Sequence, residues 1–460
     1  MRKYYQTPST RAHKGRVTPR EEAEREPSST ERYEGDEGLP AWALPTSVQL
    51  SLADLAGTVK EGLLAMAVAT GFEVMYTMMD ADVEALCGPK GRHDPGRSAY
   101  RHGSDDGEVS LGGRRVAVRR PRVRSADGSS ELAVPSYEAF SSADLLGAMV
   151  LEKMMAKIST RRYRAGLEPV GKEVEAAAGS VSKSSVSRRF VKTTNERLAE
   201  LMGSDISGLD LVAVLIDGVH FGEHVCVAAL GVGSDGKKHP LGLVEGSTEN
   251  STVVKGLLAD LRGRGLDTAK AVLVVIDGAK ALSSAVHEVF DRPVVQRCQI
   301  HKLRNVKSHL PEDLGNTVAS KMRAAYRNPS ALAAEAKLEA LAKELERAHP
   351  GAAASLREGI EETLTVTRLG VHPSLARCLR STNSIESMIE ICRDHSANVK
   401  NWSSGQMALR WCAAGMVEAE KQFRRVDGYM HLPALRRALE AHAGMSVTPP
   451  SYDNEKEQAA

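Results

Sequence analysis

The pattern of apolar and polar residues divides the chain into stretches of different character. Residues 1 to about 45 are charged, polar and proline-containing, which predicts a disordered leader. Residues 46–87 repeat apolar residues at helical spacing, whereas residues 88–107, rich in Gly, Asp and Arg, favour a loop. Residues 143–200 and 311–375 lack a strand pattern, and we expect both to be helical.

Residues 210 to 310 combine strand and helix patterns. We expect strands at 211–217, 224–231, 239–246, 271–277 and 293–297, and helices at 250–264, 280–289 and from 299. A tight turn at Gly233-Ser234-Asp235-Gly236 makes the second and third strands antiparallel. Three antiparallel strands followed by helix–strand–helix–strand is the order of an RNase H-like sheet, in which the first and fourth strands are neighbours. Further helices are expected at 383–396, with Asn383 as N-cap, at 404–425 and at 431–443.

Two of the predicted strands end on an aspartate followed by glycine, at Asp217 and Asp277. If the strands are neighbours, two carboxylates meet at one sheet edge, and at about 4 Å their repulsion is roughly 4 kcal/mol. A divalent cation would neutralise such a pair. Glu386 begins a predicted helix and offers a third carboxylate, with Glu390 one turn later as the alternative. Three carboxylates form a hard oxygen site that suits Mg²⁺.

Basic residues are concentrated in two regions, although the net charge is only +2. Residues 90–124 hold ten Lys and Arg against four Asp and Glu, and residues 151–200 hold eleven against six. A polyanion partner and a solvated basic surface both explain this excess. Residues 109–124 alternate apolar and basic positions, which predicts a hairpin. Its arginines would hold phosphates or protect a strand edge; they are Arg114, Arg115, Arg119, Arg120, Arg122 and Arg124.

The second basic region has the layout of a helix-turn-helix reader of DNA, which plain helical hairpins share. Ser159-Thr160 would cap one helix, and the turn at Gly179 to Ser182 would cap the next. The candidate DNA contacts are Arg161, Arg162, Lys183, Ser184, Ser185, Arg188 and Arg189.

Six scattered cysteines fit a reducing compartment, and no apolar run approaches a membrane span, so we expect a cytoplasmic protein. Cys298 and His301 share one helix face, as half of a zinc site would, but no second pair follows. A buried thiol with a satisfied histidine is the simpler interpretation. The one we prefer places His301 beside the metal site, where it contacts the scissile phosphate or orders its surroundings. Trp402 and Trp411 are expected in the core, with base stacking as the alternative for Trp402.

Four stretches make the chain resemble bacterial insertion-sequence transposases of the Mutator type. They are Leu215 to Gly218, Val275 to Ala279, Gln296 to Asn305 and Arg380 to Glu386. The resemblance implies an RNase H-like catalytic domain (206–310 and 376–447) with an all-α insertion at 311–375. Residues 159–162 and 182–189 also resemble the DNA-binding region of this family. We expect a mainly helical DNA-binding region before the catalytic domain, divided into 46–108, a basic hairpin region at 109–142 and a helix-turn-helix-like domain at 143–205. The residue pattern predicts a disordered tail at 448–460.

The resemblance implies that Asp217, Asp277 and Glu386 form the catalytic acidic triad and hold two Mg²⁺ ions, with Mn²⁺ as a substitute. Cys298 and His301 match the family's Cys-x-x-His, and Arg393 a basic position on the helix of Glu386. The expected activity is cleavage and strand transfer of double-stranded DNA at transposon ends by a homodimer or higher multimer. The alternatives are a nuclease of the same fold without strand transfer and a DNA-binding regulator.

Overall fold

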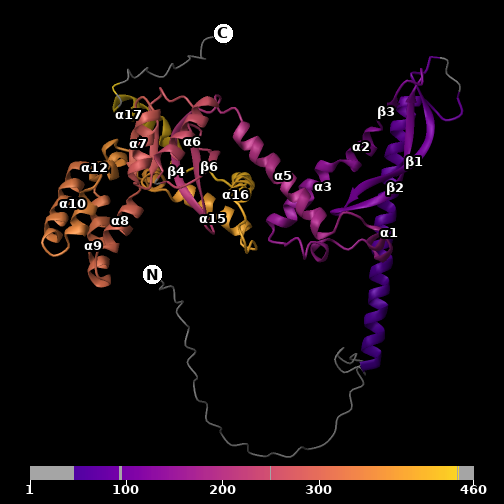
Figure 1. Cartoon of the computed structure of the whole chain (residues 1–460), viewed down its shortest axis with the longest axis horizontal. Coiled ribbons are helices and arrows are strands. Elements are labelled where there is room, and N and C mark those ends of the chain that lie inside the picture. The colour runs from indigo at the N-terminus through magenta and orange to yellow at the C-terminus, as the bar shows by residue number, and fades with distance from the viewer. Residues whose placement is uncertain (1–45, 93–95, 249, 443, 445–460) are drawn as a thin grey trace, which may run out of the picture. The chain divides into compact units, whose positions relative to one another are not determined.

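The computed structural model describes residues 46–92, 96–248, 250–442 and 444 (Figure 1). The leader and tail predicted at 1–45 and 448–460 therefore lie outside the described residues. The chain divides into two compact units, residues 1–60 and 61–460. Of the first unit, the structure describes only the start of helix α1 (Thr46–Cys87). Both sheets belong to the second unit.

The larger sheet of the second unit is mixed and has five strands. These are β4 (Leu211–Phe221), β5 (His224–Gly233), β6 (Lys238–Glu245), β7 (Leu273–Ile276) and β8 (Val294–Arg297). Their spatial order is β6-β5-β4-β7-β8. The pairs β4–β5 and β5–β6 are antiparallel, whereas β4–β7 and β7–β8 are parallel. The predicted mixed α/β sheet, with the first and fourth strands adjacent, is confirmed.

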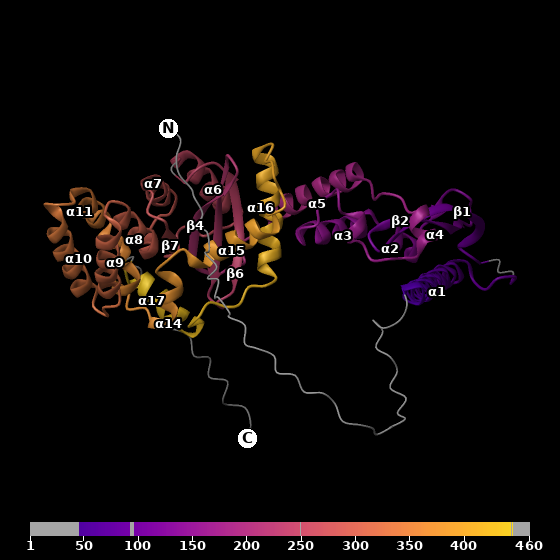
Figure 2. The ribbon, with the colours of Figure 1, turned by 90° about the horizontal axis from the view of Figure 1, so that it is seen from below.

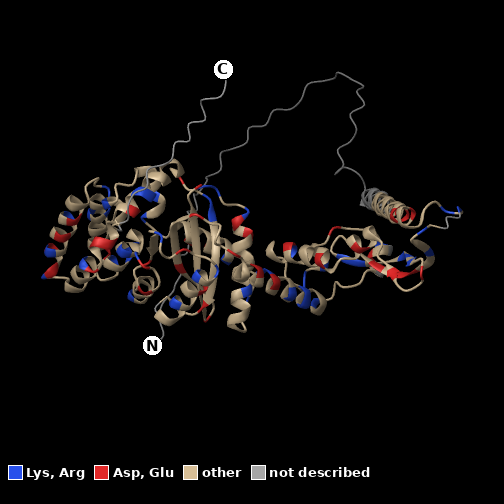
Figure 3. Ribbon diagram, turned by 90° about the horizontal axis from the view of Figure 1, so that it is seen from above, with Lys and Arg blue, Asp and Glu red and all other residues tan. Residues whose placement is uncertain are grey.

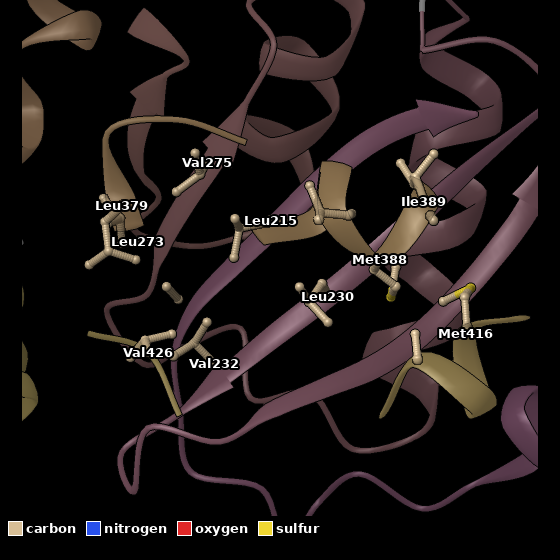
Figure 4. Packing of buried hydrophobic residues seen from close by; sticks show 14 of the residues in the cluster. Leu215, Leu230, Val232, Leu273, Val275, Leu379, Met388, Ile389, Met416 and Val426 are labelled. Carbon is tan, nitrogen blue, oxygen red and sulfur yellow. The ribbon is translucent and has the colours of Figure 1, made fainter. Parts of the chain in front are cut away.

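Helices cover both faces of this sheet, which is why residues 211–216 and 273–276 of its central strands are apolar without interruption. One face packs on α6 (Ser251–Gly263) and α7 (Lys280–Val289), and the other on α15 (Asn383–His395) and α16 (Gly405–Glu420). In Figure 4, Leu215 and Leu230 of the sheet lie near Met388 and Ile389 of α15. This packing fixes α15 over the face to which Leu215 points.

Helices follow β8, as the sequence predicts. They are α8 (Gln299–Ser308), α9 (Glu312–Tyr326), α10 (Ala331–Glu346), α11 (Pro350–Arg357), α12 (Ile360–Thr363), α13 (Thr365–Arg368) and α14 (Pro373–Leu379). The insertion expected at 311–375 covers α9 to α13 and the start of α14. Figure 2 shows α8 to α11 gathered in one group, and this group has an apolar core of its own. The side chain of Gln296 joins the insertion to β8, because it donates to Thr363 O (2.9 Å) and accepts from Val366 N (2.8 Å). The last described elements, after α16, are the 3₁₀ helix η3 (Tyr429–His431) and α17 (Leu432–His442).

The region before the larger sheet corrects two predictions. Its elements are β1 (Ala99–Leu111), β2 (Arg114–Ser125), β3 (Glu131–Leu132), α2 (Pro135–Ser141), α3 (Ala143–Met155), η2 (Arg164–Gly166), α4 (Lys172–Ala177) and α5 (Lys183–Gly203). The loop expected at 88–107 is half strand. Because the middle of β1 is exposed, it carries polar residues and lacks the alternation that marks a half-buried strand.

The second correction concerns residues 156–171, which the sequence predicts as helical. Within this described stretch, no α-helix begins at Ser159-Thr160. Turns and the three-residue η2 occupy residues 156–171 instead. Lys157 has a φ of 66°, in the left-handed region, and ends the course of α3 there. The next predicted cap is confirmed, because the Ser182 side chain accepts from Ser185 N at the start of α5.

Part of α1 contradicts the expectation that no apolar run approaches a membrane span. Residues 62–87 form one stretch that is long and apolar enough to cross a membrane, by length and composition only. Leu63 and Met66 in this stretch are 62% and 65% exposed. A single stretch of this kind is weak evidence for a span.

The turn from α6 towards β7 depends on Gly265, whose φ is 106°. A Cβ at this position would lie 2.8 Å from both the Cα and the N of Ser207. We predict that Gly265→Ala lowers the free energy of unfolding by roughly 1 to 3 kcal/mol, because backbone strain and a clash with backbone add. Gly256→Ala is the matched control, since Gly256 lies within α6 and its Cβ would meet nothing within 4 Å. In urea denaturation, the free energy of unfolding of Gly256→Ala should equal that of the wild type or exceed it by up to about 1 kcal/mol. Equal free energies of unfolding for the Gly265→Ala and Gly256→Ala variants would contradict this prediction.

Candidate functional site

The register between β4 and β7 determines where the two aspartates lie. Leu215 pairs with Val275 in parallel, an offset of 60 residues that the two preceding pairs share. Continuing this register by two residues brings Asp217 level with Asp277. Contrary to the prediction, Asp217 does not end its strand. β4 continues to Phe221, and beyond Asp217 it pairs with β5 alone. Asp277 does follow the last residue of β7.

The two carboxylates are held by nearby backbone. Asp217 is 8% exposed and accepts from Gly218 N (2.8 Å). Because strand side chains alternate, Asp217 shares the face of Leu215, which is the face that α15 covers. Asp277 accepts from Ala279 N (2.9 Å). Gly278, which separates Asp277 from Ala279, has a φ of 104°, and this lets the chain turn sharply from β7 towards α7.

Glu386 lies in the first turn of α15, on the face of the sheet that Asp217 occupies. Its Oε1 accepts from the hydroxyl of Thr382 (2.6 Å) and lies 3.9 Å from His301 Nδ1. Glu390, the alternative third acid, is exposed. The predicted cap is corrected: the N-cap is Thr382 rather than Asn383, and its hydroxyl donates to Glu386 instead of accepting from the helix backbone.

Cys298 and His301 lie at the start of α8, beside Glu386. The Cys298 Sγ caps α8 by accepting from His301 N, and it also lies 3.5 Å from Thr382 N. Among the described residues, the group of potential metal ligands whose atoms lie within 4.8 Å of one another consists of Cys298, His301 and Glu386. The three carboxylates do not form such a group by themselves, which agrees with the mutual repulsion of like charges.

Electrostatic coupling nevertheless connects all of these residues. Burial raises the pKa of Asp217 to about 6; the Gly218 amide and His301 act against this rise, and Asp277 and Glu386 add to it. Contact with Cys298 raises the pKa of His301 to about 8, against the effect of burial and with help from Asp217 and Glu386. Burial favours the neutral thiol of Cys298, but hydrogen bonds from His301 and Thr382 outweigh it and lower its pKa. The site thus combines several negative groups with one histidine that carries a proton at neutral pH.

The donor set fits a hard divalent cation. Asp217, Asp277 and Glu386 offer carboxylate oxygens, which Mg²⁺ prefers. The raised pKa of Asp217 indicates a carboxylate whose ionised form lacks sufficient compensation from the protein. The roles assigned to these residues stay predictions. Sequence reasoning missed Thr382, whose signal is a hydroxyl four residues before Glu386 at the helix start.

Several other predicted residues lie apart from these acids. Arg393 is exposed, about two turns beyond Glu386 on α15. Trp411 is in the core, as predicted, and packs on Phe190 with ring centroids 4.6 Å apart. Trp402 is partly buried and packs on Phe221 at 4.8 Å, a position that favours its expected core role over base stacking.

The predicted arginines of the hairpin are largely engaged by the protein itself. Arg114 corrects the prediction of a phosphate contact. It is 2% exposed, pairs with Glu175 (2.7 Å) and donates to Glu168 O (2.8 Å), so it joins β2 to the region around α4. Arg115 is half-buried, and Arg124 partly so. Ion pairs involve Arg119 with Asp106, and Arg120 and Arg122 with Glu131. Figure 3 shows Lys and Arg interspersed with Asp and Glu.

Helix α5 presents a different arrangement of cations. Lys183, Ser184 and Arg188 are exposed, and Ser185 is half-exposed. Arg189 is half-buried, and its Nη1 has no hydrogen-bond partner within the described chain. A pocket of about 270 Å³ opens between the start of α3 and this part of α5; Arg188, Arg189 and Lys192 line it together with Asp144 and Glu196. Arg161 and Arg162 are exposed on the turns that precede η2.

Comparison with known proteins gives consistent matches. A family model described as "Transposase, Mutator family" matches residues 45–426. The transposase for insertion sequence element ISRM5 of Rhizobium meliloti is 28% identical over 366 residues, covering 79% of this chain and 90% of that protein. The transposase for IS6120 of Mycolicibacterium smegmatis is 27% identical over 298 residues, covering 62% and 90%. A probable insertion-sequence transposase of Corynebacterium diphtheriae is 31% identical over 221 residues, covering 47% and 63%.

The raised pKa of Asp217 predicts a pH-dependent cost in protein without metal. Because the pKa of the folded state, about 6, exceeds the model value of 3.8, stability falls as pH rises from about 4 to 6 and stays lower above. The shift corresponds to about 3 kcal/mol. In EDTA at pH 7, Asp217→Asn should therefore raise the free energy of unfolding by roughly 1 to 3 kcal/mol, and the gain should vanish at pH 4. Denaturant titrations at both pH values measure these free energies of unfolding. Glu390→Gln, at an exposed carboxylate, is the control. An Asp217→Asn protein that is less stable than the wild type at pH 7 would refute the prediction.

Proposed function

Because the chain belongs to the Mutator family of transposases, we propose that it binds the terminal inverted repeats of an insertion sequence and catalyses metal-dependent cleavage and strand transfer of DNA. The observation that carries this proposal is the placement of Asp217, Asp277 and Glu386 on one face and edge of the sheet. The strand order β6-β5-β4-β7-β8 supports an RNase H-like catalytic domain of the DDE type.

Asp217, Asp277 and Glu386 would hold the Mg²⁺ ions, or Mn²⁺ in their place. When bound, two such ions lower the pKa of the attacking hydroxyl and stabilise the leaving oxygen in an in-line displacement. Asp217 is buried and feels the charges of both other acids, so its carboxylate would be the central ligand of the three. Reaction through water or a DNA 3′-hydroxyl needs no covalent intermediate, and so no protein nucleophile is assigned.

The residues around the acids would act on the substrate by charge and position. His301 carries a proton at neutral pH and lies 3.9 Å from Glu386, so it adds a positive charge beside the acids. A scissile phosphate entering this edge would be attracted by that charge. Cys298 is buried and caps α8, so its part is to hold the helix start that carries His301.

DNA backbone contact is best supported on α5. Lys183 and Arg188 are exposed, and within the described chain neither belongs to an ion pair. Arg189 lines the adjoining pocket, and its buried Nη1 has no hydrogen-bond partner in the described chain, so a phosphate oxygen that entered the pocket would supply an acceptor. These features favour α5 over the hairpin, whose arginines pair with Asp106 and Glu131. Bringing two transposon ends together would require a homodimer or higher multimer, acting on DNA in the bacterial cytoplasm.

The second candidate function is that of a nuclease with the same acids but no strand transfer. Product analysis separates the two, because a transposase gives joined donor–target molecules and a nuclease gives only nicks. A DNA-binding regulator without catalysis would give neither product.

For catalysis, we predict that Asp217→Asn, Asp277→Asn and Glu386→Gln each slow nicking of end DNA by at least about 100-fold, because a lost ligand removes several kcal/mol and each 1.4 kcal/mol is a factor of ten. Binding of the DNA end, measured by gel shift, should remain within a few-fold of wild type. Glu390→Gln provides the control, since Glu390 is exposed on the same helix and should cut normally. Normal nicking by any of the three variants would remove that residue from the catalytic set.

For DNA binding, we predict that Lys183→Ala and Arg188→Ala weaken binding to end and unrelated DNA alike, because both contacts are to phosphate. Each should reduce the slope of log affinity against log salt by about 1. Arg197→Ala is the matched control on the same helix, since Arg197 already pairs with Glu200 (2.7 Å). Fluorescence anisotropy across a salt series measures the slopes, and unchanged slopes in both test variants would move the DNA contact elsewhere.

A further inference from the structure

Thr382 lies at the point where the elements of the candidate site meet. It is fully buried, and it precedes α15 directly. Its hydroxyl oxygen is 2.6 Å from Glu386 Oε1, 3.4 Å from His301 Nδ1 and 3.4 Å from Cys298 Sγ. Three side chains from two segments, β8–α8 and α15, therefore converge on one hydroxyl group.

A hydroxyl has a single hydrogen, and this decides how the contacts with Glu386 and His301 are made. A carboxylate offers only acceptors, and its contact is by far the shortest, so the hydrogen of Thr382 goes to Glu386. Towards His301, the hydroxyl oxygen then offers a lone pair, and Nδ1 must present its N–H. This leaves Nε2 as the ring nitrogen that can face a substrate.

The backbone of the same residue completes the arrangement. The Thr382 N–H approaches Cys298 Sγ (3.5 Å), and the Thr382 carbonyl accepts from Glu386 N (2.9 Å). Both side-chain contacts of Glu386 use Oε1. Oε2 is thus the oxygen that remains for a cation.

We propose that Thr382 is a positioning residue of the reaction: its hydroxyl fixes the Glu386 carboxylate with Oε2 available to a divalent cation, and it fixes the ring orientation of His301. The proposal rests on the proposed function, because it assigns Glu386 to the metal. It adds a residue that acts through others and touches neither metal nor DNA. The partners of metal ligands orient them, and their loss typically weakens metal binding or activity.

The test compares Thr382→Val, which removes the hydroxyl at nearly constant shape, with Thr382→Ser, which keeps it. We expect Thr382→Val to require about 10 to 100 times more Mg²⁺ for half-maximal single-turnover nicking, and Thr382→Ser to restore the wild-type requirement within a few-fold. Ser387→Ala is the control, since Ser387 is an exposed hydroxyl in the same helix that donates to Asn383 O. It should leave the Mg²⁺ requirement unchanged. Thr382→Ala replaces the valine variant if that protein does not fold.

Equal Mg²⁺ requirements of Thr382→Val and wild type would overturn the proposal. So would a serine variant as impaired as the valine variant, because packing and not the hydroxyl would then matter. Binding of Mn²⁺ without DNA, followed by electron paramagnetic resonance, gives a readout that does not depend on activity. It should weaken in Thr382→Val and recover in Thr382→Ser.

A crystal structure of metal-free Thr382→Val separates this proposal from the proposed function. If the wild type neither binds Mn²⁺ nor cuts DNA, the proposed function fails. The crystal structure of the variant still tests whether Thr382 positions Glu386 and His301. We expect the Glu386 carboxylate to leave its place beside residue 382 and the His301 ring to change its orientation. Both side chains remaining where they are in the wild type would overturn the positioning role.

Discussion

The parallel pairing of β4 with β7 is the constraint on which the site depends. Its register brings Asp217 level with Asp277, so two carboxylates separated by 60 residues meet at one edge of a buried sheet. Asp217 is buried there, and burial raises its pKa. The proton on His301 compensates this charge in part. A divalent cation would compensate it more fully, which is the physical reason to link this edge with metal-dependent chemistry.

The rest of the fold brings two further segments to that edge. Packing of Met388 and Ile389 on the sheet fixes α15, whose first turn carries Glu386. The backbone N–H of Gln299 donates to Arg380 O (3.0 Å), which joins the start of α8 to the segment that leads into α15. The long insertion therefore begins and ends beside the acids. Near its C-terminal end, the insertion is also joined to β8, because Gln296 bonds Thr363 O and Val366 N.

The sequence predicts this region well because its strands are buried on both faces and its acids interrupt continuous apolar runs. Asp217 and Asp277 could be selected on that signal, and Glu386 by its place at the start of a predicted helix. Their spatial relation required the strand order. Thr382 could not be selected, because a buried hydroxyl resembles any helix cap until its partners are known. The prediction for Arg114 was wrong because residue type shows charge but not burial, and Glu175 lies 61 residues away in sequence. The polar strand β1 was missed because exposure on both faces removes the alternation of apolar residues.

The claim that three distant acids bind divalent cations over this edge has one direct test. Crystals of the protein with a DNA end should be soaked in Mn²⁺ and measured for anomalous scattering at the manganese edge. The account predicts one or two peaks about 2.0 to 2.6 Å from carboxylate oxygens of Asp217, Asp277 and Glu386. Anomalous density bound only by Cys298 and His301, or none near Asp217, would contradict it.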